Sequence, residues 1–309
     1  MEIIRYKKEM SFGAQPSVIA LGFFDGVHLG HRALIRRAKG EANKRGLSLS
    51  VFTFYSECEV KGSSSRLYTT EAKCELLGTL GVERVYLADF SELSSLSPDE
   101  FVFSVLIDAL SCSVAVSGED FRFGKGAAGN ASDLCRLMKE RGKEAITVPD
   151  ELFGGEKIST TMIKKLLFSG RIREANELLD TAFFFDATVE HGRSVGRSLG
   201  IPTVNNSLPK NCRDISKGVY LSSVKIGSKF YTGLTNIGTC PTFEERDIHA
   251  ETFILDFSGE VYGETVRIHL LDYIREERRF ETEKELLLEI EKNVKEAKTL
   301  YKNGNWRIT

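Results

Sequence analysis

Two histidines set three residues apart in a glycine-rich segment are the side chains whose type and spacing most directly suggest chemistry. Residues 22–31 read GFFDGVHLGH. Glycine has no side chain to hold a ligand away from the backbone, and the imidazoles of His28 and His31 can both donate hydrogen bonds to phosphate oxygens. The segment therefore predicts a phosphate site. Its predicted nucleotide contacts are Gly22, Phe23, Asp25 and Gly30.

Two other interpretations of the histidine pair are open. Zinc is held by nitrogen and sulfur ligands, but a zinc site needs a third protein ligand. No compact cluster of cysteine and histidine accompanies His28 and His31 in the sequence. The histidines could also be structural residues of a tight turn. We take the phosphate site as the main interpretation and keep the other two as alternatives.

A second glycine-rich segment, residues 192–205, reads GRSVGRSLGIPTVN. Backbone amides of such a loop can surround a polyphosphate. Thr203 and Asn205 lie two residues apart, so on an extended strand their side chains share one face. Their neutral oxygens suit Mg²⁺, which fills most of its coordination sphere with phosphate oxygens and water. A glycine-rich hairpin of a barrel is the alternative interpretation. The predicted phosphate contacts of this segment are Gly192, Gly196 and Arg197.

The elements that must position the first site alternate between strands and helices. This alternation predicts parallel strands joined by crossover helices, hence an α/β fold with an open, doubly wound parallel sheet. Such sheets bind ligands at the carboxyl ends of their strands, where a helix N-terminus favours anions. The strands are expected at residues 18–23, 49–54, 84–90, 113–117 and 145–148, and the helices at 30–45, 70–79, 97–110 and 132–141.

Near residue 183 the pattern changes to short strand-like segments with turns, followed by one long helical pattern at 283–301. This predicts a small antiparallel β-barrel with a terminal helix. A chain of 309 residues usually needs more than one core, and we expect domains at 1–180 and 181–309. The strands of the second domain are expected at 184–190, 218–226, 230–237, 251–257 and 264–272, with hairpin turns at 225–229 and 257–260.

Composition and charge disfavour several classes of protein. The apolar share of 41% and the charged share of 28% are ordinary for a globular protein. A net charge of −2 gives no bulk attraction for nucleic acid, and no apolar stretch is long enough to predict a membrane partner. Six cysteines without a CxxC pair, and no apolar leader at the start, favour reduced thiols and a cytoplasmic location. Oligomerisation is compatible with the sequence but not indicated by it.

The first segment resembles a known signature. HxGH after a first strand is similar to the signature of the nucleotidylyltransferase superfamily, and residues 158–164, ISTTMIK, resemble its usual companion. The longer form GxFDGxHxGH, with GEDFRFG at 118–124, resembles the adenylyltransferase half of the bacterial bifunctional riboflavin kinase/FAD synthetase family. The resemblance implies that His28 and His31 hold the α-phosphate of ATP. The other contacts that it implies are Ser159, Thr160, Thr161 and Lys164 for the outer phosphates, Asp120 for ribose or metal, and Phe121 for flavin.

The second segment resembles the riboflavin kinase motif GRxLGxPTxN. The following segments GVY at 218–220, TNIG at 235–238 and PTF at 241–243 agree with it. The resemblance implies that Glu251 is the general base that takes the proton of the riboflavin 5′-hydroxyl. It also implies magnesium ligands at Thr203 and Asn205 and flavin contacts at Arg275 and Glu277.

The resemblance spans roughly residues 15–300 and implies a two-step enzyme that phosphorylates riboflavin to FMN and then adenylates FMN to FAD, releasing pyrophosphate. The expected partners are riboflavin, FMN and ATP with Mg²⁺, without a tightly bound prosthetic group, nucleic acid or membrane. Two departures leave alternatives open. Lys164 stands where the family more often has arginine, and residues 53–58 lack the family's prolines and histidine. A chain with only the kinase active, or a non-catalytic flavin-binding regulator, are the alternatives.

Overall fold

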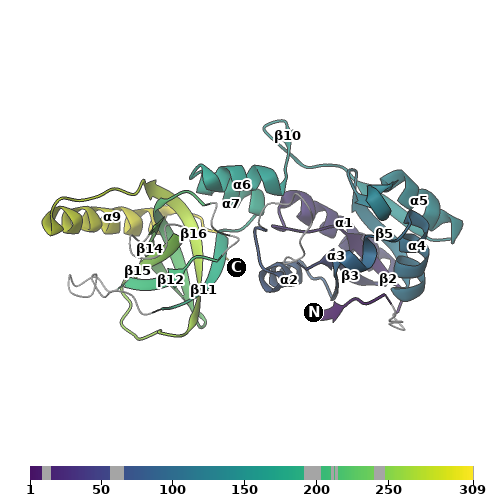
Figure 1. The fold of residues 1–309 in the computed structure, drawn as a ribbon, viewed down its shortest axis with the longest axis horizontal. Helices are drawn as coiled ribbons and strands as arrows, with labels where there is room; N and C mark the ends of the chain where they lie inside the picture. The colour runs from purple at the N-terminus through teal and green to yellow at the C-terminus, as the bar shows by residue number, and fades with distance from the viewer. Residues whose placement is uncertain are drawn as a thin grey trace. The chain divides into compact units, whose positions relative to one another are not determined.

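The computed structural model describes residues 1–8, 15–55, 66–190, 203–209, 212, 215–239 and 248–308. The chain divides into two units, Met1–Thr160 and Thr161–Thr309, and each is built around its own six-stranded sheet (Figure 1). No helix in the described ranges combines the length and apolar character needed to cross a bilayer. The predicted phosphate contacts Gly192, Gly196 and Arg197 lie outside the described residues.

A parallel sheet forms the centre of the first unit, in the order β1-β4-β3-β2-β5-β8. Every pair of neighbouring strands in it is parallel. The chain runs outward from β2 through β3 to β4, and then from β5 to β8 in the opposite direction, so the order reverses between β2 and β5. The prediction of a doubly wound sheet is therefore confirmed. The strands are β1 (Glu2–Arg5), β2 (Ser17–Leu21), β3 (Ser48–Phe54), β4 (Arg84–Ala88), β5 (Cys112–Gly118) and β8 (Glu144–Val148).

Helices cover both faces of this sheet. Ile19 and Leu21 of β2 belong to a buried cluster with residues of η1 (Phe101–Ala109) and α5 (Ala131–Glu140). Val18 and Ala20 alternate with them, are fully buried and therefore face the opposite side, where α1 (Leu29–Arg45) contacts β2, β3 and β5. The remaining elements of this unit are α2 (Thr70–Thr79), α3 (Phe90–Leu93), α4 (Pro98–Glu100), η2 (Lys125–Ala127), β6 (Arg122–Phe123), β7 (Gly129–Asn130), β9 (Leu152–Phe153) and β10 (Glu156–Lys157).

The second unit holds an antiparallel sheet in the order β11-β16-β13-β14-β15-β12. Its two edge strands also meet. The amide of Glu190 donates to the carbonyl of Asn205 at 2.8 Å, and the side chain of Asn206 donates to the carbonyl of Thr188 at 2.9 Å. The sheet thus closes into the predicted small barrel. Its strands are β11 (Phe183–Thr188), β12 (Thr203–Ser207), β13 (Gly218–Ile226), β14 (Lys229–Thr239), β15 (Ile248–Ile254) and β16 (Thr265–Arg275).

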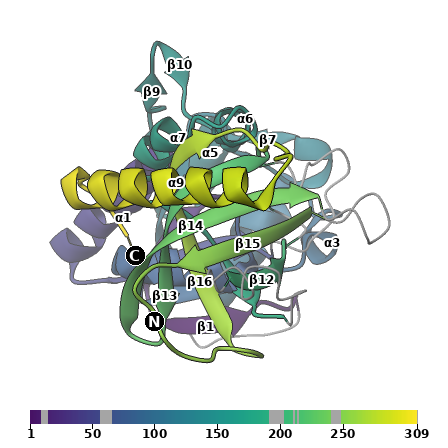
Figure 2. The same ribbon diagram turned by 90° about the vertical axis from the view of Figure 1, so that its left-hand side faces the viewer.

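The terminal helix α9 (Glu283–Asn303) lies across this sheet (Figure 2). Its Ala297 is buried in a cluster with Val219 and Leu221 of β13 and Leu234 of β14. Two shorter helices, α6 (Thr160–Phe168) and α7 (Ile172–Leu179), precede β11. The hairpin turn expected at 225–229 is confirmed, because β13 pairs with β14 there. The one expected at 257–260 is wrong, because β15 and β16 are not neighbours in the sheet.

Candidate active sites

The loop after β2 brings both histidines to the start of α1. His28 is the N-cap residue of this helix, and its Nδ1 accepts a hydrogen bond from the amide of His31 at 3.5 Å. The two imidazole rings are stacked, with 3.7 Å between centroids and 19° between planes. Because Nδ1 of His28 accepts, a neutral ring carries its hydrogen on Nε2. The Nε2–H group is thus the one that can donate to a ligand.

Burial keeps both imidazoles neutral. Desolvation, and then the positive charge of Lys157, lowers the pKa of His28 to about 4, against a smaller opposing effect of Asp120. Desolvation also lowers the pKa of His31 well below its usual value, with further contributions from His28, Lys73 and Lys157. At neutral pH both rings can therefore donate hydrogen bonds to phosphate but carry no charge to it.

The backbone of this loop is strained and is held from two sides. Phe24 and Val27 have φ angles of 52° and 46°, in the left-handed region that non-glycine residues rarely occupy. The carboxylate of Asp25 is buried and accepts from the amide of Leu67 at 2.9 Å. The hydroxyl of Thr160 donates to the carbonyl of Asp25 at 2.8 Å. Such strain persists where the surroundings impose it, and it is concentrated at functional sites.

Two of the predicted glycines lie directly against rings. A Cβ atom on Gly30 would lie 3.3 Å from Cε1 of His28, and one on Gly22 would lie 3.0 Å from the ring of Phe24. Both distances are shorter than ordinary carbon contacts. The glycines therefore let the His28 and Phe24 rings pack onto the backbone.

Phe23 lies under two cations that the sequence did not single out. The guanidinium carbon of Arg66 is 3.9 Å and Nζ of Lys73 is 5.5 Å from its ring centroid. Lys73 is fully buried, and its ammonium group also donates to the carbonyl of Phe54 and, at 3.5 Å, to that of Phe23. These bonds fix the carboxyl ends of β2 and β3. Phe121 is half-buried and stacks on Phe123 at 5.6 Å between centroids.

Asp120 belongs to a charged cluster at the point where the strand order reverses. It lies two residues beyond the end of β5, and Asp150 lies two residues beyond the end of the neighbouring β8. Nζ of Lys157 is 2.6 Å from Oδ2 of Asp120 and 2.7 Å from Oδ1 of Asp150. Burial lowers the pKa of Lys157, but hydrogen bonds to the two aspartates outweigh that effect and raise it. Sequence reasoning missed Lys157, although it directly precedes the matched segment 158–164.

The residues of that matched segment fall on both sides of the division between the units. Ser159 and Thr160, the first residue of α6, belong to the first unit with the histidines. Thr161 and Lys164 follow within α6 in the second unit. Their contact with phosphate therefore stays a prediction. In the described part of the chain, no three histidine, cysteine or acidic side chains come together as a metal site.

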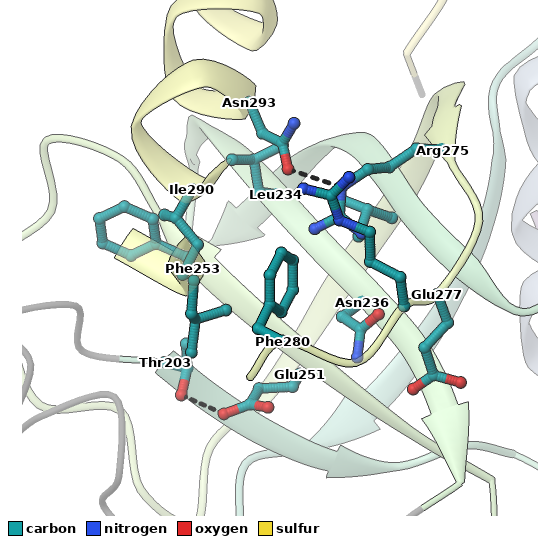
Figure 3. Close-up of a pocket in the computed structure, with 13 residues that line it drawn as sticks. Thr203, Leu234, Asn236, Glu251, Phe253, Arg275, Glu277, Phe280, Ile290 and Asn293 are labelled. Atoms are coloured by element: carbon teal, nitrogen blue, oxygen red, sulfur yellow. Dashed lines mark hydrogen bonds between the residues drawn. The ribbon is translucent and has the colours of Figure 1, made fainter. Parts of the chain in front are cut away.

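The second candidate site is a pocket of about 290 Å³ in the barrel unit. One wall comes from strands β12 to β15, and the other from α9 and the segment between β16 and α9 (Figure 3). Most of its wall area is apolar, and four of its thirteen lining residues are charged. The lining residues are Thr203, Val219, Leu234, Asn236, Glu251, Phe253, Arg275, Glu277, Arg278, Phe280, Leu286, Ile290 and Asn293.

Glu251 of β15 supplies one of the two carboxylates of this pocket, and Glu277 supplies the other. The cross-strand partners of Glu251 are Asn205 on β12 and Asn236 on β14, so the three side chains share one face of the sheet. The hydroxyl of Thr203 donates to Oε1 of Glu251 at 2.7 Å, which leaves Oε2 free of that bond (Figure 3). The structure thus brings together Glu251, Thr203 and Asn205, the three residues predicted to act at this site.

The two predicted flavin contacts also line this pocket. Arg275, at the end of β16, donates from Nε to Oδ1 of Asn293 on α9 at 3.0 Å. Burial lowers the pKa of Arg275, although the Glu289 carboxylate opposes this. The carboxylate of Glu277 packs on Gly238, where a Cβ atom would lie only 2.2 Å from Oε1. Sequence reasoning missed Phe280 and Arg278, which lies 4.7 Å from the Phe280 ring centroid.

Comparisons with known proteins find matches for both parts of the chain. The family model described as FAD synthetase matches residues 12–162, and the one described as riboflavin kinase matches residues 179–301. A bifunctional riboflavin kinase/FMN adenylyltransferase of Bacillus subtilis is 36% identical, over 93% of each chain. Its counterpart from Listeria monocytogenes is 34% identical, over 92% of each chain.

One solved structure resembles the whole chain. It is described as a macrolide-efflux protein from Streptococcus pneumoniae, has a TM-score of 0.87 and is 30% identical, over 99% of this chain and 100% of its own. That description concerns the pneumococcal protein, and what it adds here is the two-unit fold. From the identity over nearly full length and the two matched domains, the chain belongs to the bifunctional riboflavin kinase/FMN adenylyltransferase family.

Proposed function

We propose that this chain makes FAD from riboflavin in two ATP-dependent steps, each at its own site. The barrel unit phosphorylates riboflavin to FMN, and the parallel-sheet unit adenylates FMN. The observation that carries the proposal is that each unit holds a cluster of side chains suited to its own reaction. In the first unit His28 is stacked on His31 at the start of α1. In the second, Glu251 is bonded to Thr203 in a largely apolar pocket.

In the first step the riboflavin 5′-hydroxyl attacks the γ-phosphorus of ATP. A bond forms between that oxygen and phosphorus, the bond to the β–γ bridging oxygen breaks, and ADP leaves. The hydroxyl proton passes to Glu251, for which Oε2 is the acceptor because Oε1 is engaged by Thr203. A general base of this kind contributes about 10²–10⁴ in rate. The apolar walls from Leu234, Phe253 and Ile290 suit the flat flavin ring.

Mg²⁺ fits the donor set on β12. The hydroxyl of Thr203 and the side-chain amide oxygen of Asn205 are neutral oxygens on one face of that strand, and Mg²⁺ accepts few protein oxygens beside phosphate and water. These two residues would hold it. Bound there with ATP, the ion supplies neutralising charge to the phosphates. We propose Mg²⁺ as the metal partner and no tightly bound prosthetic group.

In the second step a phosphate oxygen of FMN attacks the α-phosphorus of a second ATP. The new oxygen–phosphorus bond forms as the bond to the α–β bridging oxygen breaks, and pyrophosphate leaves. No covalent enzyme intermediate is involved, so positioning and stabilisation of charge supply the catalysis. His28 donates from Nε2 to the α-phosphate with His31 beside it. Asp120 holds ribose or metal, Phe121 contacts flavin, and Ser159, Thr160, Thr161 and Lys164 hold the outer phosphates.

Product analysis tests the proposal. The protein is incubated with riboflavin, ATP and Mg²⁺, and the flavins are separated by chromatography. We expect FMN to appear first and FAD to follow. If FMN forms but FAD does not, the protein is a riboflavin kinase with a degenerate adenylyltransferase unit. If neither product forms, the remaining interpretation is a flavin-binding regulator. We further propose that the protein acts in the cytoplasm and that its domains are 1–180 and 181–309, which the limits of the two matched families support.

A further inference from the structure

Within the first unit, the histidines bring no positive charge to the phosphates of ATP, and the proposed phosphate contact Lys164 belongs to the second unit. The pKa of His28 is about 4 and that of His31 is also well below its usual value, so both are neutral when ATP, an anion with several charges, arrives. Lys73 is a nearby cation, but it is fully buried and bound to backbone carbonyls. It cannot turn toward a ligand without giving up both of those hydrogen bonds.

Lys157 combines proximity to the histidines with access to a ligand. Its charge acts on both His28 and His31, and its side chain is 37% exposed. It ends β10 and directly precedes Ile158 and Ser159, which lead into α6. Its ammonium group lies between Asp120 and Asp150, beyond the carboxyl ends of β5 and β8. This is the edge of the sheet where such folds bind nucleotides.

The two ion pairs that hold Lys157 are exchangeable. Their carboxylates are partly exposed, at 69% for Asp120 and 31% for Asp150, and ion pairs of this kind contribute little to stability. A phosphate oxygen accepts a shorter and stronger charge-assisted hydrogen bond from an ammonium group. The triphosphate of ATP can therefore replace the aspartates as the partner of the Lys157 ammonium group, with only a small loss of free energy from the broken ion pairs.

We propose that Lys157 is a further phosphate-binding residue of the first site, restrained by Asp120 and Asp150 until the triphosphate of ATP takes over its ammonium group. The inference rests on the proposed adenylyltransferase function. It predicts opposite effects for the lysine and for Asp150. Removing the lysine weakens the use of ATP, whereas removing Asp150 releases the lysine and leaves the use of ATP unimpaired or improved.

The test measures FAD formation from FMN over a range of ATP concentrations in the full-length protein. For Lys157→Met we expect kcat/KM for ATP to fall at least fivefold, mainly through KM. We expect kcat/KM for ATP in Lys157→Arg to lie within fivefold of the wild-type value, and in Asp150→Asn to equal or exceed the wild-type value. Riboflavin phosphorylation by the same preparations reports on folding. Lys139→Met is the charge-matched control, because Lys139 is exposed near the end of α5, away from the carboxyl edge of the sheet.

Several results would overturn the proposal. A fall of less than fivefold for Lys157→Met would remove the lysine from phosphate binding. If Asp150→Asn lowers kcat/KM for ATP as much as Lys157→Met does, the role of Lys157 is only to connect the ends of β5 and β8. If kcat/KM for ATP in Lys157→Arg is as low as in Lys157→Met, the positive charge is not what the site needs. FAD formation by the wild type separates these results from failure of the proposed function: a wild type that makes no FAD refutes that function, and the inference with it.

Discussion

Replacing His28 with serine separates the two tasks that this residue performs. The imidazole caps α1 through Nδ1, and its Nε2–H is the proposed donor to the α-phosphate. Serine is a preferred N-cap residue, so it keeps the first task and loses the second. Alanine loses both, and it serves as the comparison variant.

The expected magnitudes differ enough to distinguish these tasks. The cap bond from the amide of His31 is 3.5 Å long, beyond the usual range for such bonds. This hydrogen bond should therefore add to the free energy of unfolding an amount near the low end of the roughly 0.5–2 kcal/mol that is typical of N-caps. Loss of one preorganised donor to a developing oxyanion costs about 2.7–4 kcal/mol. We expect His28→Ser to lower kcat for FAD formation by roughly 10²–10³, with a much smaller change in the free energy of unfolding.

Three measurements on one preparation test this expectation. Chromatography follows FMN conversion to FAD, urea unfolding gives stability, and riboflavin phosphorylation reports on the barrel unit. A decrease in FAD formation of less than tenfold in a stably folded His28→Ser protein would remove this imidazole from the mechanism. A loss confined to His28→Ala would show that the cap, and not the donor, is what the reaction needs.

Three further predictions concern the separate sites, the barrel unit and pH. Glu251→Gln should lower FMN formation by about 10²–10⁴ and leave FAD formation from supplied FMN within twofold; loss of both activities would refute separate sites. A protein beginning at residue 181 should phosphorylate riboflavin, but one beginning at 161 should resist urea better, because Asn176 donates to Leu270 and accepts from Phe183; inactivity of both would contradict an independent kinase unit. The lowered pKa of His28 means that the unfolded chain binds an extra proton between about pH 6.5 and 4. Wild-type stability should therefore fall as pH decreases through this window, by about 3 kcal/mol more than that of His28→Ser, and equal pH slopes in urea unfolding would refute the burial argument.

Local signals predicted much of the fold. The helix expected from residue 97 begins there, with a capping box between Ser97 and Glu100 and with Pro98 at its first position. The alternation of strands and helices predicted the doubly wound sheet. β1 was missed because it is a four-residue edge strand with little burial. The false hairpin at 257–260 arose because a turn-like composition does not reveal which strands are neighbours in a barrel. That pairing depends on contacts between residues far apart in the sequence.

The candidate sites were predictable where one short segment carries the chemistry. The histidine turn and the Thr203–Asn205 pair each lie in such a segment. The role of Glu251 was implied only by the family resemblance, and its hydrogen bond with Thr203 depends on the pairing of β12 with β15. Lys73 was missed because a lysine in a helix is normally read as exposed, and only the packing of α2 shows it buried under Phe23. Lys157 was missed because its aspartate partners come from two different strand ends.

Mixing two defective proteins tests the central claim that one chain carries two independent ATP-using sites. His28→Ser alone should convert riboflavin to FMN and accumulate it, and Glu251→Gln alone should form FAD only from added FMN. Together, supplied with riboflavin, ATP and Mg²⁺, they should form FAD. If the mixture fails although each variant keeps its own activity, or if either variant loses both activities, two independent sites are contradicted.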